Sequence, residues 1–164
     1  MKLYGHRGSP FVRKALVVLE EKGLRYQSVE LSSVPGRKSP ELLELHPLGK
    51  TPVPRDGDVV PDSSVCAYLE KKHPTPALYP DEPADLARAL FLEEYSDTRL
   101  FEVLSGILFE RMVKPRVMGQ PPDEARVEHL TLSGLAIDRS RWRRSARYHE
   151  ALRSRPSFVS AMRP

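Results

Sequence analysis

Ser9 is the residue of this sequence that is best placed to do chemistry. It follows a glycine turn and directly precedes a proline and an amphipathic run, in the stretch GHRGSPFVRK at residues 5–14. A serine in this setting is a typical helix N-cap, whose hydroxyl accepts a hydrogen bond from a backbone amide. A helix N-terminus also attracts anions, so the same hydroxyl could be offered to a negatively charged atom. From the residues alone both roles stay open.

Cysteine and histidine offer little further chemistry. Cys66 is the only cysteine, which excludes an internal disulfide and a cysteine metal cluster and is typical of a reducing compartment. It falls on the apolar face of an expected helix, so we interpret it as a small core residue. The histidines lack metal-ligand spacing, and we expect no metal and interpret them as turn, surface or packing residues: His6, His46, His73, His129 and His149.

The composition indicates a folded protein of moderate positive charge. Of the 164 residues 40% are hydrophobic, and the formal net charge is +4. Eight arginines and one acid, Glu150, lie between Arg139 and Arg163. Such a segment can bind nucleic acid or an anionic membrane, but no recognition motif accompanies it, so we interpret it as a solvated helix face. The N-terminal residues lack an apolar leader and no segment is long enough to span a membrane, so we expect a cytoplasmic protein without a membrane partner.

The first half of the chain predicts strands alternating with helices. We expect a buried strand at 1–4, a helix at 9–22 and a second strand at 24–31, which together form a βαβ unit. A short helix at 39–45 follows, then a short strand at 51–53, a hairpin turn at 55–58 and a returning strand at 59–60. A further helix is expected through residues 65–69. This half of the chain therefore has an α/β character.

The second half predicts helices alone. Lys72–Asp85 contains four prolines and is the natural linker. Apolar residues recur at helical spacing over 86–112, and the stretch KPRVMGQPPDEARVEH is expected to break that helix and begin another near Asp123. Residues 141–152 are expected to be helical, with RSRPSF closing the helix. We expect three parts: an α/β domain at 1–72, a proline-rich linker at 73–84 and an all-helical domain at 85–164.

Four stretches, taken in order, resemble the glutathione transferase family. GSPFVRKALVVLEEKGLRY is similar to the first strand–turn–helix of its serine-type classes, such as tau, zeta, theta-like and bacterial members. HPLGKTPV resembles the segment of this family that contains a cis proline, and PDSSVCAYLEKKHP resembles the acidic-serine pair before its third helix. HPTPALYPDEPADLARALFLEEY resembles its domain connection. The resemblance implies a thioredoxin-like N-terminal domain, classed as α/β, and an all-α C-terminal domain.

The resemblance also assigns roles to particular residues. Ser9 would stabilise the thiolate of glutathione, which is a co-substrate, and no separate cofactor is implied. Thr51 would contact glutathione through its backbone beside a cis Pro52, while Asp62 and Ser63 would bind the γ-glutamyl end. Lys38 and Lys50 would contact the glycyl carboxylate of glutathione. Four residues would line a pocket for the electrophile: Tyr95, Arg99, Phe109 and Met112.

The sequence departs from the family pattern in its second half. After DEARVEH the family continues with a buried central helix, whereas here Leu130–Gly134 leads directly toward the terminal region. We therefore expect a shortened helical domain with apolar surface left without a partner. The implied activity is conjugation of glutathione to a small hydrophobic electrophile, a detoxification reaction, by a homodimer that does not bind nucleic acid. The alternatives are a non-catalytic binding or regulatory module of the same fold and a glutathione-dependent dehalogenase, etherase or isomerase.

Overall fold

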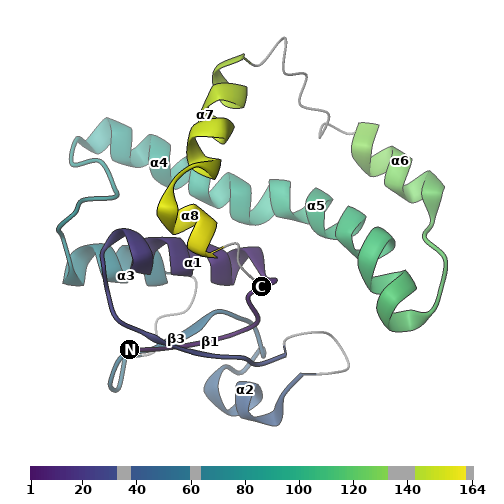
Figure 1. Cartoon of the computed structure of the whole chain (residues 1–164), viewed down its shortest axis with the longest axis horizontal. Helices are drawn as coiled ribbons and strands as arrows, with labels where there is room; N and C mark the ends of the chain where they lie inside the picture. The colour runs from purple at the N-terminus through teal and green to yellow at the C-terminus, as the bar shows by residue number, and fades with distance from the viewer. Residues whose placement is uncertain (33–37, 60–63, 133–142, 162–164) are drawn as a thin grey trace. The chain divides into compact units, whose positions relative to one another are not determined.

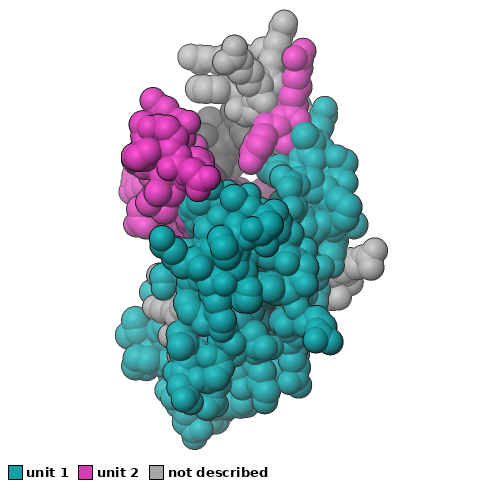
Figure 2. Space-filling view, turned by 90° about the vertical axis from the view of Figure 1, so that its left-hand side faces the viewer, with its two compact units in different colours: residues 1–79, 150–164 teal, residues 80–149 magenta. Residues whose placement is uncertain are grey.

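The chain forms two compact units. The computed structural model describes residues 1–32, 38–59, 64–132 and 143–161. The first unit contains residues 1–79 together with 150–164, and the second contains residues 80–149 (Figure 2). Residues 150–164, which the sequence placed in the helical half, therefore belong to the first unit. The reason is a contact between distant parts of the chain, described below, which no local pattern reveals.

A small mixed sheet is the centre of the first unit. Its strands are β1 (Lys2–Tyr4), β2 (Gln27–Val29) and β3 (Val53–Arg55), in the order β2-β1-β3. β1 pairs with β2 in parallel and with β3 in antiparallel orientation. The helix α1 (Pro10–Glu21) connects the two parallel strands, so the expected βαβ unit is confirmed. β2 is shorter than the predicted 24–31, and β3 begins at Val53, after Pro52. Val59 forms an isolated bridge with Asp56, and residue 60 lies outside the described residues.

The two faces of the sheet carry different helices. On one face Leu3 packs in a core formed with α1, α3 (Val65–Lys72) and α8 (Pro156–Ala161). On the other face Tyr4 packs in a core that includes Leu42 of α2 (Pro40–Leu45). Successive side chains of a strand point to opposite faces, so adjacent residues of β1 contribute to both cores. Figure 1 shows α1, α3 and α8 on one side of the strands and α2 on the other. Cys66 is 2% exposed in the first of these cores, and the prediction of a core cysteine is confirmed.

The helix α1 follows its sequence pattern closely. Pro10 occupies its first turn, and Val12, Ala15, Leu16 and Leu19 are its buried residues. The chain leaves the helix at Gly23, whose φ of 61° lies in the left-handed region that favours glycine. The predicted helix at 9–22 is therefore confirmed to within a residue at each end.

The helix α8 docks on α1 and explains why the chain's last residues belong to the first unit. Ala161 is buried in the core beside α1. At the surface the Ser157 hydroxyl donates a hydrogen bond to the Glu21 carboxylate, and Arg155 forms an ion pair with it at 2.8 Å. These two groups, Ser157 foremost, hold the pKa of Glu21 below its ordinary value.

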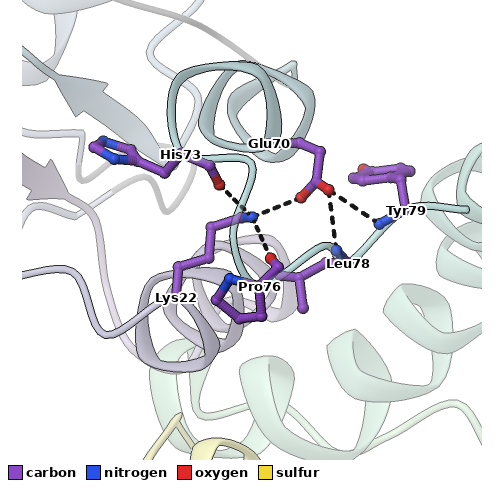
Figure 3. Close-up of polar contacts among 6 residues, drawn as sticks. All are labelled: Lys22, Glu70, His73, Pro76, Leu78 and Tyr79. Atoms are coloured by element: carbon purple, nitrogen blue, oxygen red, sulfur yellow. Dashed lines mark hydrogen bonds and ion pairs between the residues drawn. The ribbon is translucent and has the colours of Figure 1, made fainter. Parts of the chain in front are cut away.

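A buried lysine ties the end of α1 to α3 and to the chain after it. The Lys22 ammonium is inaccessible to solvent and lies 2.7 Å from the Glu70 carboxylate. It also donates to the backbone carbonyls of His73 at 2.7 Å and Pro76 at 2.8 Å (Figure 3). Glu70 in turn accepts hydrogen bonds from the amides of Leu78 and Tyr79. This Lys22–Glu70 cluster holds residues 73–79 against α1 and α3 within the first unit.

The second unit is helical, as predicted, and the break expected in KPRVMGQPPDEARVEH is confirmed, because the next helix begins at Glu124. Residues 83–118 follow one another as helix without interruption, past the expected end at 112, and the segment ends at Gly119, whose φ is 65°. Pro115 lies inside the π-helical part of this segment. The elements are α4 (Pro83–Tyr95), η1 (Ser96–Leu100), α5 (Phe101–Leu108), η2 (Phe109–Met118) and α6 (Glu124–Leu132), and α7 (Arg143–Arg153) spans the end of this unit.

Much apolar surface of the second unit is exposed, as the sequence predicted. Neither α4 nor α5 has a buried residue. Phe91 is 67% exposed and Leu92 60%. The described part of the chain contains no helix that is long and apolar enough to cross a membrane.

Candidate functional site

The candidate site lies where β1 ends, α1 begins and β3 starts. Ser9 is the N-cap residue of α1 and is half-buried, with extended backbone angles of φ −72° and ψ 128°. Its carbonyl accepts the first intrahelical hydrogen bond, from the Arg13 amide at 3.0 Å. Its hydroxyl makes no capping hydrogen bond. Of the two roles that the sequence left open, the plain capping role is therefore not the one that the hydroxyl performs here.

The turn before Ser9 is held by hydrogen bonds from both main chain and side chains. The Ser9 amide donates to the His6 carbonyl at 2.9 Å. The Gly8 amide donates to Nδ1 of His6 at 2.8 Å, and Nε of Arg13 donates to the Arg7 carbonyl at 2.7 Å. The backbone that leads into the helix is therefore fixed before Ser9 is reached.

Gly5 allows the start of β3 to approach this turn. It follows β1 with a φ of 146°, and a Cβ placed on it would lie 2.7 Å from Cγ2 of Val12 and 3.0 Å from Cβ of Thr51. Only glycine fits such a contact and such a φ. Thr51 and the first turn of α1 are thus brought against the same residue. The Thr51–Pro52 peptide bond is cis, as the family resemblance implies.

The turn between α2 and β3 contains Lys50 and is contacted by Lys38, which precedes α2. Lys38 donates to the Leu48 carbonyl at 2.8 Å, and its chain lies against Gly49, where a Cβ would be 2.9 Å from Cδ of Lys38. Lys50 is exposed. The turn itself is shaped by His46, which is buried and whose Nδ1 accepts from the Leu48 amide at 3.1 Å. The structure thus places both ammonium groups on the segment that leads into Thr51, and their predicted contact with a carboxylate stays a prediction.

The described structure does not test the remaining predicted residues. Asp62 and Ser63 lie outside the described residues. The four candidates for the electrophile pocket belong to the second unit, so their predicted role stays a prediction. Arg99 pairs with Glu102 at 2.9 Å, and the other three are exposed: Tyr95 by 51%, Phe109 by 37% and Met112 by 41%.

A cavity of about 400 Å³ lies elsewhere in the first unit. Its lining includes Lys2, Gln27 and Arg55, which are paired across the end of the sheet opposite to Gly5 and Thr51. It contains none of the predicted site residues, so it does not enlarge the candidate site.

The sequence analysis missed two residues of the turn. His6 was interpreted only as a turn, surface or packing residue, and Arg13 was not singled out. The spacing of His6 and Gly8 is a weak signal for this hydrogen bond. Asn and Asp side chains accept from the backbone amide two residues later and so stabilise a turn, and a histidine ring nitrogen can accept in the same way. Imidazole is rarely used in this way, and no sequence pattern shows which ring nitrogen faces the amide.

The first unit has a parallel β1–α1–β2 crossover and a cis proline before β3, and the second unit is helical. The chain therefore has the fold of the class of proteins that combine a thioredoxin-like N-terminal domain with an all-α C-terminal domain. Comparison with known proteins identifies the family. Residues 3–77 match the family described as "Glutathione S-transferase, N-terminal domain". The rice (Oryza sativa subsp. japonica) protein named "Probable glutathione S-transferase GSTF2" is 34% identical over 134 residues, which is 78% of this chain.

Two further comparisons agree. The "Uncharacterized GST-like protein YibF" of Escherichia coli K12 is 30% identical over 85% of this chain. The solved structure of a theta class glutathione S-transferase from Xanthomonas axonopodis pv. citri, with glutathione bound, shares the fold with a TM-score of 0.81. It is 24% identical, covering 99% of this chain and 97% of that chain. Residues 3–77 therefore form an N-terminal domain of the glutathione S-transferase family. The chain spans 61% of the length of the rice protein and 66% of the E. coli protein.

Proposed function

We propose that this chain is a glutathione transferase in which the Ser9 hydroxyl stabilises the thiolate of bound glutathione. The observation that carries the proposal is that Ser9 occupies the N-cap of α1 without a capping hydrogen bond from its side chain. The hydroxyl and the partial positive charge of the helix N-terminus would both favour a nearby anion. Free thiols titrate near pH 8.5, so such groups increase the thiolate fraction at neutral pH.

The proposed reaction is a substitution at an electrophilic carbon. The glutathione thiol first loses its proton to solvent, and Ser9 donates a hydrogen bond to the resulting thiolate. The sulfur then forms a bond to carbon, and the leaving group departs with its bonding electron pair as an anion. Ser9 is therefore a stabiliser of the nucleophile, and it forms no covalent bond.

The glutathione molecule is proposed to be held by further residues of the first unit. The backbone of Thr51 next to cis Pro52 offers the pairing to the cysteinyl part, and Lys38 and Lys50 offer positive charge to the glycyl carboxylate. Asp62 and Ser63 are proposed for the γ-glutamyl end. The electrophile is proposed to be small and hydrophobic, with the apolar side chains of the second unit as its binding surface, and the assembly is proposed to be a homodimer.

One observation favours a second candidate function. The helices α4 and α5 have no buried residue, and an electrophile pocket needs side chains that are fixed by packing. A non-catalytic glutathione-binding module needs only the first unit. Dehalogenation and ether cleavage begin with the same attack of the thiolate at carbon and release a halide or an alcohol, whereas isomerisation releases glutathione unchanged. A substrate panel with product analysis distinguishes them.

The test compares the parent chain with Ser9→Ala and with Ser28→Ala, an exposed serine of β2 that serves as the matched control. Glutathione affinity is measured by calorimetry and turnover with a chromogenic aryl halide. We expect Ser9→Ala to bind glutathione but to lose about 100-fold in kcat/KM, as for loss of one preorganised donor, while Ser28→Ala matches the parent. Binding without turnover in the parent supports the binding module. An active Ser9→Ala variant overturns the role of Ser9.

A further inference from the structure

The peptide group between Arg7 and Gly8 is held on both of its polar atoms by side chains. Its carbonyl accepts from Nε of Arg13 at 2.7 Å, and its amide donates to Nδ1 of His6 at 2.8 Å. A peptide group is planar, so two opposed hydrogen bonds fix its orientation and prevent it from flipping. Without them the flanking Gly8 would permit many orientations.

This fixed peptide group leads directly to Ser9. The Ser9 amide donates to the His6 carbonyl at 2.9 Å, and its carbonyl accepts from the Arg13 amide at 3.0 Å. The same two residues, His6 and Arg13, therefore hold Ser9 on both sides through main-chain groups and hold the preceding peptide group through side chains. With the backbone fixed, the position of the Ser9 hydroxyl depends on a single side-chain torsion.

Gly8 gives an independent indication that the His6 ring belongs to this arrangement. Its φ is not in the left-handed region, unlike that of Gly5 or Gly23, so the backbone conformation alone does not require glycine. A Cβ at Gly8 would however lie 2.7 Å from Nδ1 and 2.8 Å from Cε1 of His6. The ring occupies the space that any other side chain at this position would need.

We propose that His6 and Arg13 are positioning residues, which fix the Arg7–Gly8 peptide group so that Ser9 presents its hydroxyl to the glutathione sulfur. The inference rests on the proposed role of Ser9 and adds to it the groups that act through Ser9. The imidazole acts as a neutral hydrogen-bond acceptor at Nδ1, and the guanidinium acts as a donor at Nε. Neither residue is required to touch glutathione.

The experiment uses variants that remove or retain each hydrogen bond. His6→Leu removes the acceptor, whereas His6→Asn retains an oxygen in place of Nδ1, since asparagine accepts from the amide two residues on. Arg13→Met removes the donor and keeps an unbranched side chain, and Arg25→Met, at an exposed arginine, is its control. Gly8→Ala displaces the ring. Circular dichroism and urea unfolding show that each variant is folded.

Three quantities are measured: glutathione affinity by calorimetry, kcat/KM with an aryl halide, and the pKa of the bound thiol from thiolate absorbance against pH. We expect His6→Leu and Arg13→Met each to lower kcat/KM roughly tenfold and to raise the thiol pKa, because the donor is displaced from the sulfur. Glutathione affinity changes little, and His6→Asn regains most of the lost rate. Gly8→Ala lowers the rate in the parent and adds nothing in the His6→Leu background, since both changes break one contact.

The outcomes separate this inference from the proposed function. If Ser9→Ala impairs the enzyme while His6→Leu and Arg13→Met leave the rate and the thiol pKa unchanged, the positioning role is refuted and the proposed function stands. If His6→Asn is as impaired as His6→Leu, the acceptor role of Nδ1 is refuted. If the parent binds glutathione without turnover, the positioning role is judged from the thiol pKa alone: an unchanged pKa in His6→Leu and Arg13→Met refutes it. If the parent does not bind glutathione, both proposals are overturned.

Discussion

Replacement of Lys22 by methionine tests what holds the first unit together. The Lys22 ammonium is fully buried and its three contacts are with Glu70, the His73 carbonyl and the Pro76 carbonyl, at 2.7 to 2.8 Å. Methionine has a similar length but no donor. The variant therefore leaves two carbonyl groups and one carboxylate oxygen without this partner.

The expected loss follows from these contacts. Removing one partner of a buried ion pair costs about 3 to 5 kcal/mol. The value for Lys22→Met should lie near the lower end, about 3 kcal/mol, because Glu70 keeps its hydrogen bonds from the amides of Leu78 and Tyr79. The matched control is Lys72→Met, since Lys72 pairs with Asp56 but has a side chain that is 45% exposed. A far smaller loss is expected there because solvent screens the pair.

The assay is urea unfolding followed by far-ultraviolet circular dichroism, with the midpoint and the slope fitted separately. The double variant Lys22→Met/Glu70→Gln should regain part of the stability lost in Lys22→Met, because a neutral amide replaces an uncompensated carboxylate and its oxygen can still accept from the amides of Leu78 and Tyr79. Equal losses for Lys22→Met and Lys72→Met would refute the reasoning, as would a double variant that is less stable than Lys22→Met.

The same cluster predicts a dependence on pH. Burial opposes the ionisation of Glu70, but the Lys22 ammonium and the two amides outweigh it and hold the pKa of this carboxyl below its ordinary value. The stabilisation is therefore complete above the ordinary pKa and is lost as pH falls through the lower folded value. The free energy of unfolding of the parent should decrease in acid more steeply than that of Lys22→Met.

Three further changes test other parts of the fold. Gly5→Ala should weaken glutathione binding measured by calorimetry, because its Cβ would lie 2.7 Å from Val12 and separate α1 from the start of β3; unchanged affinity contradicts this. Lys114 holds the pKa of Glu110 below its ordinary value, so Glu110→Gln should remove part of the loss of stability in acid. If the free energy of unfolding of Glu110→Gln varies with pH as that of the parent does, this contribution of Glu110 is excluded. Leu16→Ala, in the core, should cost about 3 kcal/mol in urea unfolding, whereas Leu92→Ser, 60% exposed, should change stability by less than about 0.5 kcal/mol.

The elements around the candidate site could be predicted because their signals are local. Proline and glycine mark the two ends of α1, and its buried positions recur at helical spacing, so the sequence determines the helix within a residue. Ser9 could be predicted as the N-cap of α1 for the same reason, whereas its proposed catalytic role came from the family resemblance and stays a prediction. The cis bond before Pro52 came from the family resemblance, because nothing in the composition of that segment distinguishes cis from trans.

The parts that could not be predicted depend on contacts between distant residues or on local geometry. The docking of α8 on α1 joins Ser157 to Glu21, which are far apart in the chain, so no periodicity reveals it. The helix expected over 86–112 continues to Met118 through Pro115 in a π-helical segment, and helical spacing of apolar residues does not predict where such wider turns occur. The role of His6 depends on which ring nitrogen faces Gly8, and this is a property of a side-chain rotamer.

The two candidate functions separate along the two units of the chain. The described residues proposed to hold glutathione, Ser9, Lys38, Lys50, Thr51 and Pro52, all belong to the first unit, which has its own core on both faces of the sheet. The proposed electrophile residues all belong to the second unit, whose helices α4 and α5 have no buried residue. Glutathione affinity should therefore depend on the first unit alone, while turnover also requires order in the second. If the chain is an enzyme, changes in the second unit should alter kcat without altering glutathione affinity. If it is a binding module, the parent should show no turnover, and the same changes should leave glutathione affinity unaltered.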